Sequence, residues 1–398
     1  MSTSLQPLSA NNRDASLDIL RGFALAGVLF IFCVSDVGSP AGYSNSFLDD
    51  LIAWPKYILI EERMYGMLII IFGIGFHVQL EKAKKKGVSL VPAFSRRLIG
   101  LLLIGVIHAI LLSTRDILMF YALAGIVLLF VRNISNRFLF ILILVLFLIH
   151  VPAVRYLFPY VWPQIKALKQ PNNYSDHIQY NWQFFKLYHQ VYFIYIEMLT
   201  HFLFGFWIGR TGVLQKIKTS KKLRRRLLFI SLAASAVLIP GYYFWLEKSA
   251  DALFDKITNP ALRFFISTGM NSIWQLWVLV CVTLYGTILI DLFVSGKLKK
   301  LMGSLAAFGQ MALSNYLIQS LILVPYLLFF DRYNNLPPFN GFILFLIVFA
   351  LQLLFSTWWM ARYKLGPFEW LLRSFTYWSW QPIKKPAPAP STNLKFSF

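Results

Sequence analysis

Charge is scarce in this sequence. Asp, Glu, Lys and Arg make up 14% of the 398 residues, against about 25% in soluble domains, while hydrophobic residues make up 58%. So few charged side chains leave too little polar surface to keep a chain of this length in water. The scarcity therefore excludes an ordinary soluble enzyme or binding domain and favours an integral membrane protein.

Acidic residues are scarcer than basic ones, since 17 Asp and Glu stand against 38 Lys and Arg, for a formal net charge of +21. Such a surplus can indicate a nucleic-acid-binding surface. Here, however, the basic residues form short clusters between apolar runs, as at Lys221 to Arg226. That placement is typical of the cytoplasmic loops of a membrane protein. We therefore expect a lipid bilayer, and no nucleic acid, as the partner.

Metal-binding and disulfide patterns are also missing. The two cysteines, Cys33 and Cys281, both lie inside apolar runs, which gives no disulfide framework and no thiolate motif. The six histidines are scattered, without the spacing of a zinc site, so we expect no metal ion. There is no phosphate-binding Gly-rich loop and no nucleophile elbow. Any chemistry must therefore come from polar groups placed within the membrane.

Ten apolar runs are long enough to cross, or nearly cross, about 30 Å of hydrocarbon. They cover residues 19–36, 64–80, 98–113, 117–131, 138–152, 190–209, 227–246, 271–294, 304–330 and 340–361. Alternating loops then place most Lys and Arg residues on one side of the membrane and most acidic residues on the other. The sequence predicts an all-α bundle of about ten transmembrane helices with both termini in the cytoplasm.

A single membrane domain at residues 17–381 follows a cytoplasmic segment at 1–16. Its long extracytoplasmic loop, residues 153–189, is rich in aromatic side chains, which indicate an interfacial helix or lid, or equally an aromatic belt at the headgroups. Residues 364–381 combine Trp and Phe with basic residues, a pattern typical of a helix in the inner interface. The Pro-rich tail 382–398 should be disordered.

Ionisable residues at the edges of spans are candidates for function, since each is costly unless paired, hydrated or functional. Asp18 and Arg21, three residues apart at the start of the first span, predict a structural ion pair or an anion contact. Glu62 and Arg63 enter the second span. The carboxylate either stabilises the helix N-terminus or acts as a general base.

His108 is the sharpest feature, because it lies in an otherwise apolar stretch. Its imidazole suits proton transfer, and Asp116, eight residues later, could orient it if the chain turns back. A purely structural hydrogen bond is the competing interpretation. Asn315, Tyr316 and Gln319 share one face of the ninth span, which lines either a cavity or a helix contact.

Several stretches, in order, resemble the YeiB family of bacterial membrane proteins, which is catalogued as a domain of unknown function. They are Leu17-Asp18-Ile19-Leu20-Arg21-Gly22-Phe23-Ala24-Leu25, Phe72-Gly73-Ile74-Gly75-Phe76, Arg96-Arg97-Leu98, Gly105-Val106-Ile107-His108-Ala109, Asp116-Ile117-Leu118 with Tyr121-Ala122, Met311-Ala312-Leu313-Ser314-Asn315-Tyr316 and Gly366-Pro367-Phe368-Glu369-Trp370. The resemblance covers nearly the whole chain.

That family is similar in its opening motif and helix count to the transmembrane acyltransferases, which include heparan glucosaminide acetyltransferases and bacterial sugar O-acetyltransferases. The resemblance implies a multi-pass protein of the bacterial inner membrane. At the superfamily level only, it implies acyl transfer from cytoplasmic acyl-CoA to an acceptor on the other face. One departure concerns the end of the opening motif, where the sugar acetyltransferases have a histidine and YeiB-like chains usually an asparagine. This chain has Phe32 followed by Cys33 there, and Arg115 replaces the glycine that commonly precedes the matched Asp116.

The leading hypothesis is an acyltransferase in which Arg21, Arg96 and Arg97 hold the phosphates of acyl-CoA. His108, oriented by Asp116 or assisted by Glu62, would activate a sugar or lipid acceptor. The candidate substrate contacts are Asp18, Arg63, Asn315, Tyr316 and Gln319. The alternatives are a transporter for a small solute or lipid, and a non-catalytic sensor that recognises a partner through residues 153–189. The sequence leaves open whether the chain forms a homo-oligomer.

Overall fold

The structure of the protein is a computed structural model. It describes residues 14–34, 46–113, 116–169, 171–188, 193–242, 257–330 and 336–385. Over these ranges the chain forms helices and their connections, with one isolated β-bridge between Tyr363 and Lys384. The predicted all-α class is therefore confirmed for the described part of the chain.

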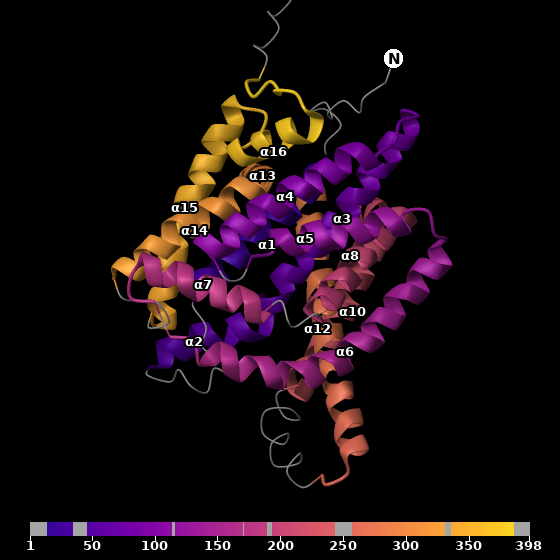
Figure 1. Ribbon diagram of the computed structural model, residues 1–398. Coiled ribbons are helices and arrows are strands. Elements are labelled where there is room, and N and C mark those ends of the chain that lie inside the picture. The colour runs from indigo at the N-terminus through magenta and orange to yellow at the C-terminus, as the bar shows by residue number, and fades with distance from the viewer. Residues whose placement is uncertain are drawn as a thin grey trace, which may run out of the picture.

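The described helices follow one another in Figure 1 as α1 (Ala15–Cys33), α2 (Phe47–Pro55), the π-helical turn η3 (Lys56–Ile60), α3 (Glu61–Lys85), α4 (Val91–Leu111), α5 (Leu118–Val131), α6 (Asn136–Lys166), α7 (Tyr174–Tyr188), α8 (Phe193–Thr211), α9 (Val213–Thr219), α10 (Lys221–Tyr242), α12 (Pro260–Val294), α13 (Lys299–Gln310), α14 (Ala312–Phe329), α15 (Pro338–Arg362) and α16 (Pro367–Tyr377). Helices α13 to α16 lie along one side, α6, α8, α10 and α12 along the other, and α1, α3, α4 and α5 between them.

Five of these helices are long and apolar enough to cross a membrane. They are α1, α4, the part of α12 from Ser272–Val294, α14 and α15. Two shorter apolar helices, α5 and Asn136–Ile149 within α6, accompany them. A membrane protein with several apolar helices thus agrees with the sequence. The number of ten spans and the cytoplasmic side of both termini stay predictions.

One expected span, residues 304–330, is divided in two. Helix α13 ends at Gln310 and α14 begins at Ala312, with Met311 outside helical geometry between them. The break is stabilised from α16, where a carboxylate oxygen of Glu369 accepts the backbone N–H groups of Leu313 at 2.6 Å and Ser314 at 3.1 Å. A carboxylate at a helix N-terminus satisfies amides that have no intrahelical partner.

The region 153–189 is mostly helical rather than an open loop. Helix α6 continues to Lys166, and α7 begins at Tyr174 and packs against α4. Of the predicted disordered tail, the four residues 382–385 are held against the end of α15, where Lys364 donates its N–H to the carbonyl of Ile383 at 2.8 Å. The rest of the tail, and the residues before Asp14 that were predicted to form a cytoplasmic segment, lie outside the described residues. Helix α16 occupies the stretch expected to form an interfacial helix.

Close backbone contacts hold α1 against α13 and α3 against α8. A Cβ added at Gly309 would lie 1.9 Å from the carbonyl oxygen of Asp18, and one at Gly22 would lie 2.2 Å from that of Leu305. Across the other contact, a Cβ at Gly205 would lie 2.1 Å from the carbonyl oxygen of Ile70. Glycine lets these backbones approach one another as in small-residue contacts between membrane helices.

Replacing Gly309 with alanine is expected to destabilise the protein, because the added methyl would overlap the backbone of α1. Overpacking of this kind costs about 1–3 kcal/mol. The matched control is Gly303→Ala on the same helix, where a Cβ meets nothing within 4 Å. Thermal unfolding of both variants in detergent measures the difference. Equal unfolding midpoints would contradict the close approach of α1 and α13.

Candidate functional site

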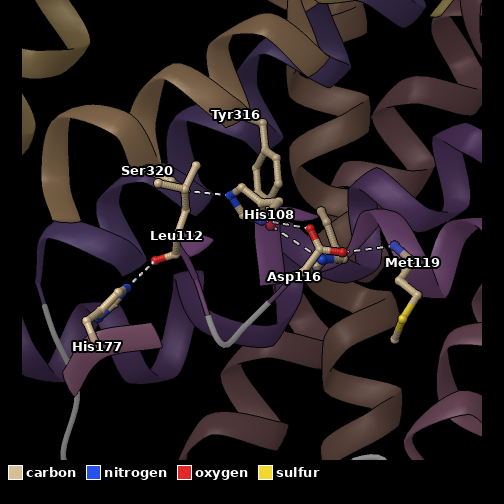
Figure 2. A network of polar contacts seen from close by, with 8 residues as sticks. His108, Leu112, Asp116, Met119, His177, Tyr316 and Ser320 are labelled. Carbon is tan, nitrogen blue, oxygen red and sulfur yellow. Dashed lines mark hydrogen bonds and ion pairs between the residues drawn. The ribbon is translucent and has the colours of Figure 1, made fainter. Parts of the chain in front are cut away.

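His108 lies in the last turn of α4, with 1% of its surface exposed. Its Nδ1 atom is 2.8 Å from Oδ2 of Asp116, and its Nε2 atom is 2.8 Å from Oγ of Ser320 on α14. Figure 2 shows the imidazole between these two partners. The predicted pairing of His108 with Asp116 is therefore confirmed, and a third polar group completes the row.

Asp116 precedes α5, directly after the turn that follows α4. Its Oδ1 atom accepts the backbone N–H of Met119 at 2.9 Å, so the same carboxylate holds the start of α5. The start of α5 lies close to α4 because α4 carries Gly105 at the crossing, where a Cβ would lie 2.6 Å from the Met119 nitrogen and 2.8 Å from Asp116 Oδ1. A side chain at residue 105 would therefore push the carboxylate away from the imidazole.

The direction of the proton chain follows from the donor and acceptor types. When Asp116 is a carboxylate it can only accept, and Nδ1 of His108 then carries the hydrogen and donates it to Asp116. Nε2 is then the lone-pair nitrogen and accepts the hydroxyl hydrogen of Ser320. The order of carboxylate, imidazole and hydroxyl is that of a catalytic triad, in which the imidazole takes the proton of the hydroxyl.

Sequence reasoning missed Ser320. One signal was present, because Ser320 lies four residues after Tyr316 and so shares its helix face. The ring of Tyr316 packs on that of His108 with centroids 4.9 Å apart, and its hydroxyl accepts the N–H of Ile117 at 3.3 Å. Tyr316 thus belongs to the site and fixes the plane of the imidazole.

Asn315 and Gln319, predicted together with Tyr316, turn toward α15 instead. The side-chain amide of Asn315 donates to Oγ of Ser356 at 2.9 Å, and that of Gln319 donates to Oε1 of Gln352 at 3.2 Å. The polar stripe was expected to line either a cavity or a helix contact. Asn315 and Gln319 form a helix contact. Interhelical amide and hydroxyl bonds of this kind hold membrane helices together.

The basic residues predicted for one anion site divide into two places. Arg21 bonds Asp18 at 3.1 Å, as the spacing predicted, and lies 3.5 Å from the position of a Cβ at Gly75 on α3. Arg97 donates to Gln79, also on α3, at 3.4 Å. Arg96 points elsewhere, because its Nε donates to the carbonyl of Thr376 in α16 at 2.7 Å.

Glu62 is likewise placed away from His108 by its described contacts. Trp274 of α12 donates its indole N–H to the Glu62 carboxylate. The guanidinium of Arg63 lies over the same indole, 3.8 Å from the ring centroid. Glu62 and Arg63 therefore form a second polar cluster, between α3 and α12. No group of three or more His, Cys, Asp or Glu that could hold a metal ion occurs in the part of the chain that the structure describes.

The end of α4, which carries His108, is capped by α7. Three side chains of α7 bond three successive carbonyls there, namely Asn181 to Ile110 at 3.0 Å, Tyr174 to Leu111 at 3.1 Å and His177 to Leu112 at 3.1 Å. The last four carbonyls of a helix have no partner within it. Helix α7 supplies those partners and so fixes the turn that bears the imidazole.

The attachment of α7 is expected to weaken as the pH falls from about 7.5 to about 5.5. Burial lowers the pKa of His177 from its ordinary value of 6.5, although the bond to Leu112 opposes this effect. The folded state therefore binds the proton less well than the unfolded state, and the stability present above pH 6.5 is lost as the pH falls below it.

His177→Gln keeps a donor for Leu112 but does not titrate, and so it is the matched variant. Thermal unfolding midpoints at the two pH values measure the effect. Wild type should lose more stability than the variant on acidification. The same loss in both proteins would show that His177 does not carry the pH dependence.

Comparison with known proteins gives the family. Residues 208–379 match the family described as "Protein of unknown function (DUF418)". The chain is 30% identical to YxaH of Bacillus subtilis over 96% of its own length and 99% of that protein. It is 24% identical to a 39.9 kDa protein of Bacillus acidopullulyticus, over 94% of this chain and 96% of that one. It is 23% identical to YeiB of Escherichia coli, over 92% of this chain and 96% of that one.

All three relatives are described as uncharacterized, and no solved structure matches the chain. The chain therefore belongs to the DUF418 family of YeiB-like proteins.

Proposed function

We propose that the protein is a membrane-bound acyltransferase whose reactive centre is the row of Asp116, His108 and Ser320. The observation that carries the proposal is the pair of 2.8 Å contacts that join His108 to a carboxylate on one ring nitrogen and to a hydroxyl on the other. A nucleophile, its base and a group that orients the base are the parts that acyl transfer through a covalent intermediate requires.

The reaction begins at Ser320. Its Oγ attacks the carbonyl carbon of the acyl-CoA thioester while Nε2 of His108 takes the hydroxyl proton. The carbon–sulfur bond breaks, and the sulfur leaves as the CoA thiol after receiving that proton, which leaves the acyl group as an ester on Ser320. An acceptor hydroxyl then gives its proton to His108 and attacks the ester. As the ester bond breaks, the proton returns to Oγ. Asp116 stays ionised throughout and holds the imidazole in place.

Arg21 and Arg97 are the proposed contacts for the phosphates of acyl-CoA. Both lie against the same part of α3, and guanidinium groups bind phosphates through paired N–H donors. The basic clusters of the sequence favour the cytoplasmic side of a bacterial inner membrane for this end of the bundle, with the chain crossing about ten times.

Tyr121 of α5 supports a route between these arginines and the triad. Its ring packs on that of Phe72, with centroids 5.2 Å apart, and the guanidinium carbon of Arg97 lies 5.6 Å from the centroid of the same Phe72 ring. The Tyr121 hydroxyl interacts electrostatically with both Arg21 and Asp116 and has no hydrogen-bond partner among the described residues. A thioester carbonyl reaching inward from the arginines would find a donor there.

Replacing Ser320 is expected to abolish acyl transfer, and replacing His108 or Asp116 is expected to slow it strongly. In purified protein given radiolabelled acetyl-CoA, wild type should retain label on Ser320, located by peptide mass spectrometry, and Ser320→Ala should retain none. His108→Ala and Asp116→Asn should slow labelling by at least about 100-fold, because the base is lost or misoriented.

His77→Ala on α3 is the matched control, because that histidine does not contact the triad and should leave labelling unchanged. Labelling that persists in Ser320→Ala would rule out the covalent intermediate. A His108→Ala protein that transfers acetyl groups like wild type would remove the proposal altogether.

Substitutions of Arg96 and Arg97 should have different effects on the affinity for CoA. Arg97→Gln is expected to weaken CoA binding, measured by calorimetry, by at least about tenfold, the equivalent of about 1.4 kcal/mol. Arg96→Gln should leave CoA affinity unchanged and lower the thermal stability, because it removes the bond to Thr376. Equal loss of affinity in both variants would contradict this assignment of the donor site.

A further inference from the structure

Arg63 is the most completely buried charged residue described, with 0% of its surface exposed. One guanidinium nitrogen, Nη1, donates to the carbonyl of Tyr57 at 3.1 Å. The other two, Nε and Nη2, are buried without a hydrogen-bond partner among the described residues. A buried charge normally has its donors satisfied, because the lost hydration costs several kcal/mol.

The two open donors lie on the same edge of the guanidinium. Nε–H and one N–H of Nη2 point in parallel and form the fork that binds a carboxylate or phosphate with two hydrogen bonds. Arg224 shows the ordinary arrangement, since its Nε donates to Oδ1 of Asp291 at 2.7 Å. In Arg63 the corresponding edge has no carboxylate acceptor among the residues that the structure describes, and a polar side chain of α12 that interacts with the guanidinium is the neutral thiol of Cys281.

Two carboxylates of this region, Glu62 and Glu197, accept hydrogen bonds from other donors. Glu62 interacts electrostatically with the guanidinium, but its side chain accepts the indole N–H of Trp274. Glu197 of α8 accepts the side-chain amide of Gln275 at 2.9 Å. Glu62 therefore balances the charge of Arg63 without occupying its fork.

The fork is held in a fixed direction by its surroundings. In η3 the backbone leaves α-helical geometry, and three successive carbonyls take side-chain donors: Tyr57 from Arg63, Ile58 from Trp277 at 2.9 Å and Leu59 from Tyr285 at 2.7 Å. The indole of Trp274 covers one face of the guanidinium at 3.8 Å. Position and plane are thus set before any ligand arrives, and π-helical turns occur frequently at functional sites.

We propose that the Nε and Nη2 edge of Arg63 binds an oxyanion, the carboxylate or phosphate group of a ligand that enters beside η3 and Trp274. The site is separate from the acyl-transfer centre, because the described contacts of Arg63 run to η3 and α12. Its existence therefore does not depend on the proposed function.

Tryptophan fluorescence can test the proposal, because Trp274 lies on the guanidinium. The full chain in detergent is titrated with inorganic phosphate and with acetate, at constant ionic strength set by chloride. Wild type should give a saturable change in emission. Trp274→Phe should remove the fluorescence change, because the reporting indole is lost. Arg63→Gln should remove the binding of the anion itself. Arg63→Lys should bind at least about tenfold more weakly, since a point charge replaces the fork.

Arg362→Gln is the matched control. Arg362 also lies over an indole, that of Trp358 at 4.8 Å, but it is an exposed side chain, and its loss should not change the titration. His108→Ala should bind phosphate like wild type, so failure of the acyl-transfer mechanism and failure of this site are distinguishable. Circular dichroism of Arg63→Gln checks that the helices remain.

Nanodiscs identify the source of the anion. In phosphatidylcholine discs, added phosphate should give the saturable change. If phosphate gives no change in phosphatidylglycerol discs, a lipid headgroup already occupies the Arg63 fork. If phosphate still gives the saturable change there, the ligand is a soluble oxyanion. The proposal is overturned if wild type gives no saturable response in detergent and in phosphatidylcholine, or if Arg63→Gln responds like wild type.

Discussion

A backbone group that loses its helical partner inside a membrane must find another partner within the protein. Three breaks in this chain meet that constraint with side chains from distant elements. Helix α7 bonds the last carbonyls of α4, α12 bonds the carbonyls of η3, and Glu369 bonds the first amides of α14. Each break therefore joins segments far apart in the sequence. The arrangement of the bundle depends on these bonds, because a shift of one of these elements would leave backbone amides or carbonyls without their partners.

The polar side chains of the candidate site lie beside those breaks for the same reason. His108 is in the last turn of α4 and Asp116 just precedes α5, so the turn between the two helices brings imidazole and carboxylate together. Asp116 serves twice, because one oxygen orients the imidazole and the other holds the first turn of α5. A change at the turn would therefore alter the structure of the bundle and the geometry of the triad together.

A contact between two side chains could be predicted from the sequence when the two residues lie close together along the chain. The pair of His108 and Asp116 was accessible, since eight residues and one turn connect them, and so was the pair of Asp18 and Arg21 within one helix. Ser320 was not, because its place beside His108 depends on how α14 rotates against α4, 212 residues away. Arg96 and Arg97 were assigned to one site although neighbours on a helix point about 100° apart, and only the packing of α16 shows which of them turns away. The break at Met311 was missed because its cap, Glu369, comes from another helix.

The burial of the triad bears on whether it is structural or reactive. All three side chains are buried and bonded to one another, and such a network stabilises a fold little more than apolar packing would. Replacing buried polar groups by well-packed apolar side chains is often neutral or stabilising. Stability alone therefore does not explain a carboxylate, an imidazole and a hydroxyl in a row within an apolar bundle. A reactive role requires that the row meet its substrate, and the element that closes over it is α7, through three hydrogen bonds to the end of α4. These bonds run to backbone carbonyls, so a movement of α7 would break three hydrogen bonds but would leave no charge unpaired.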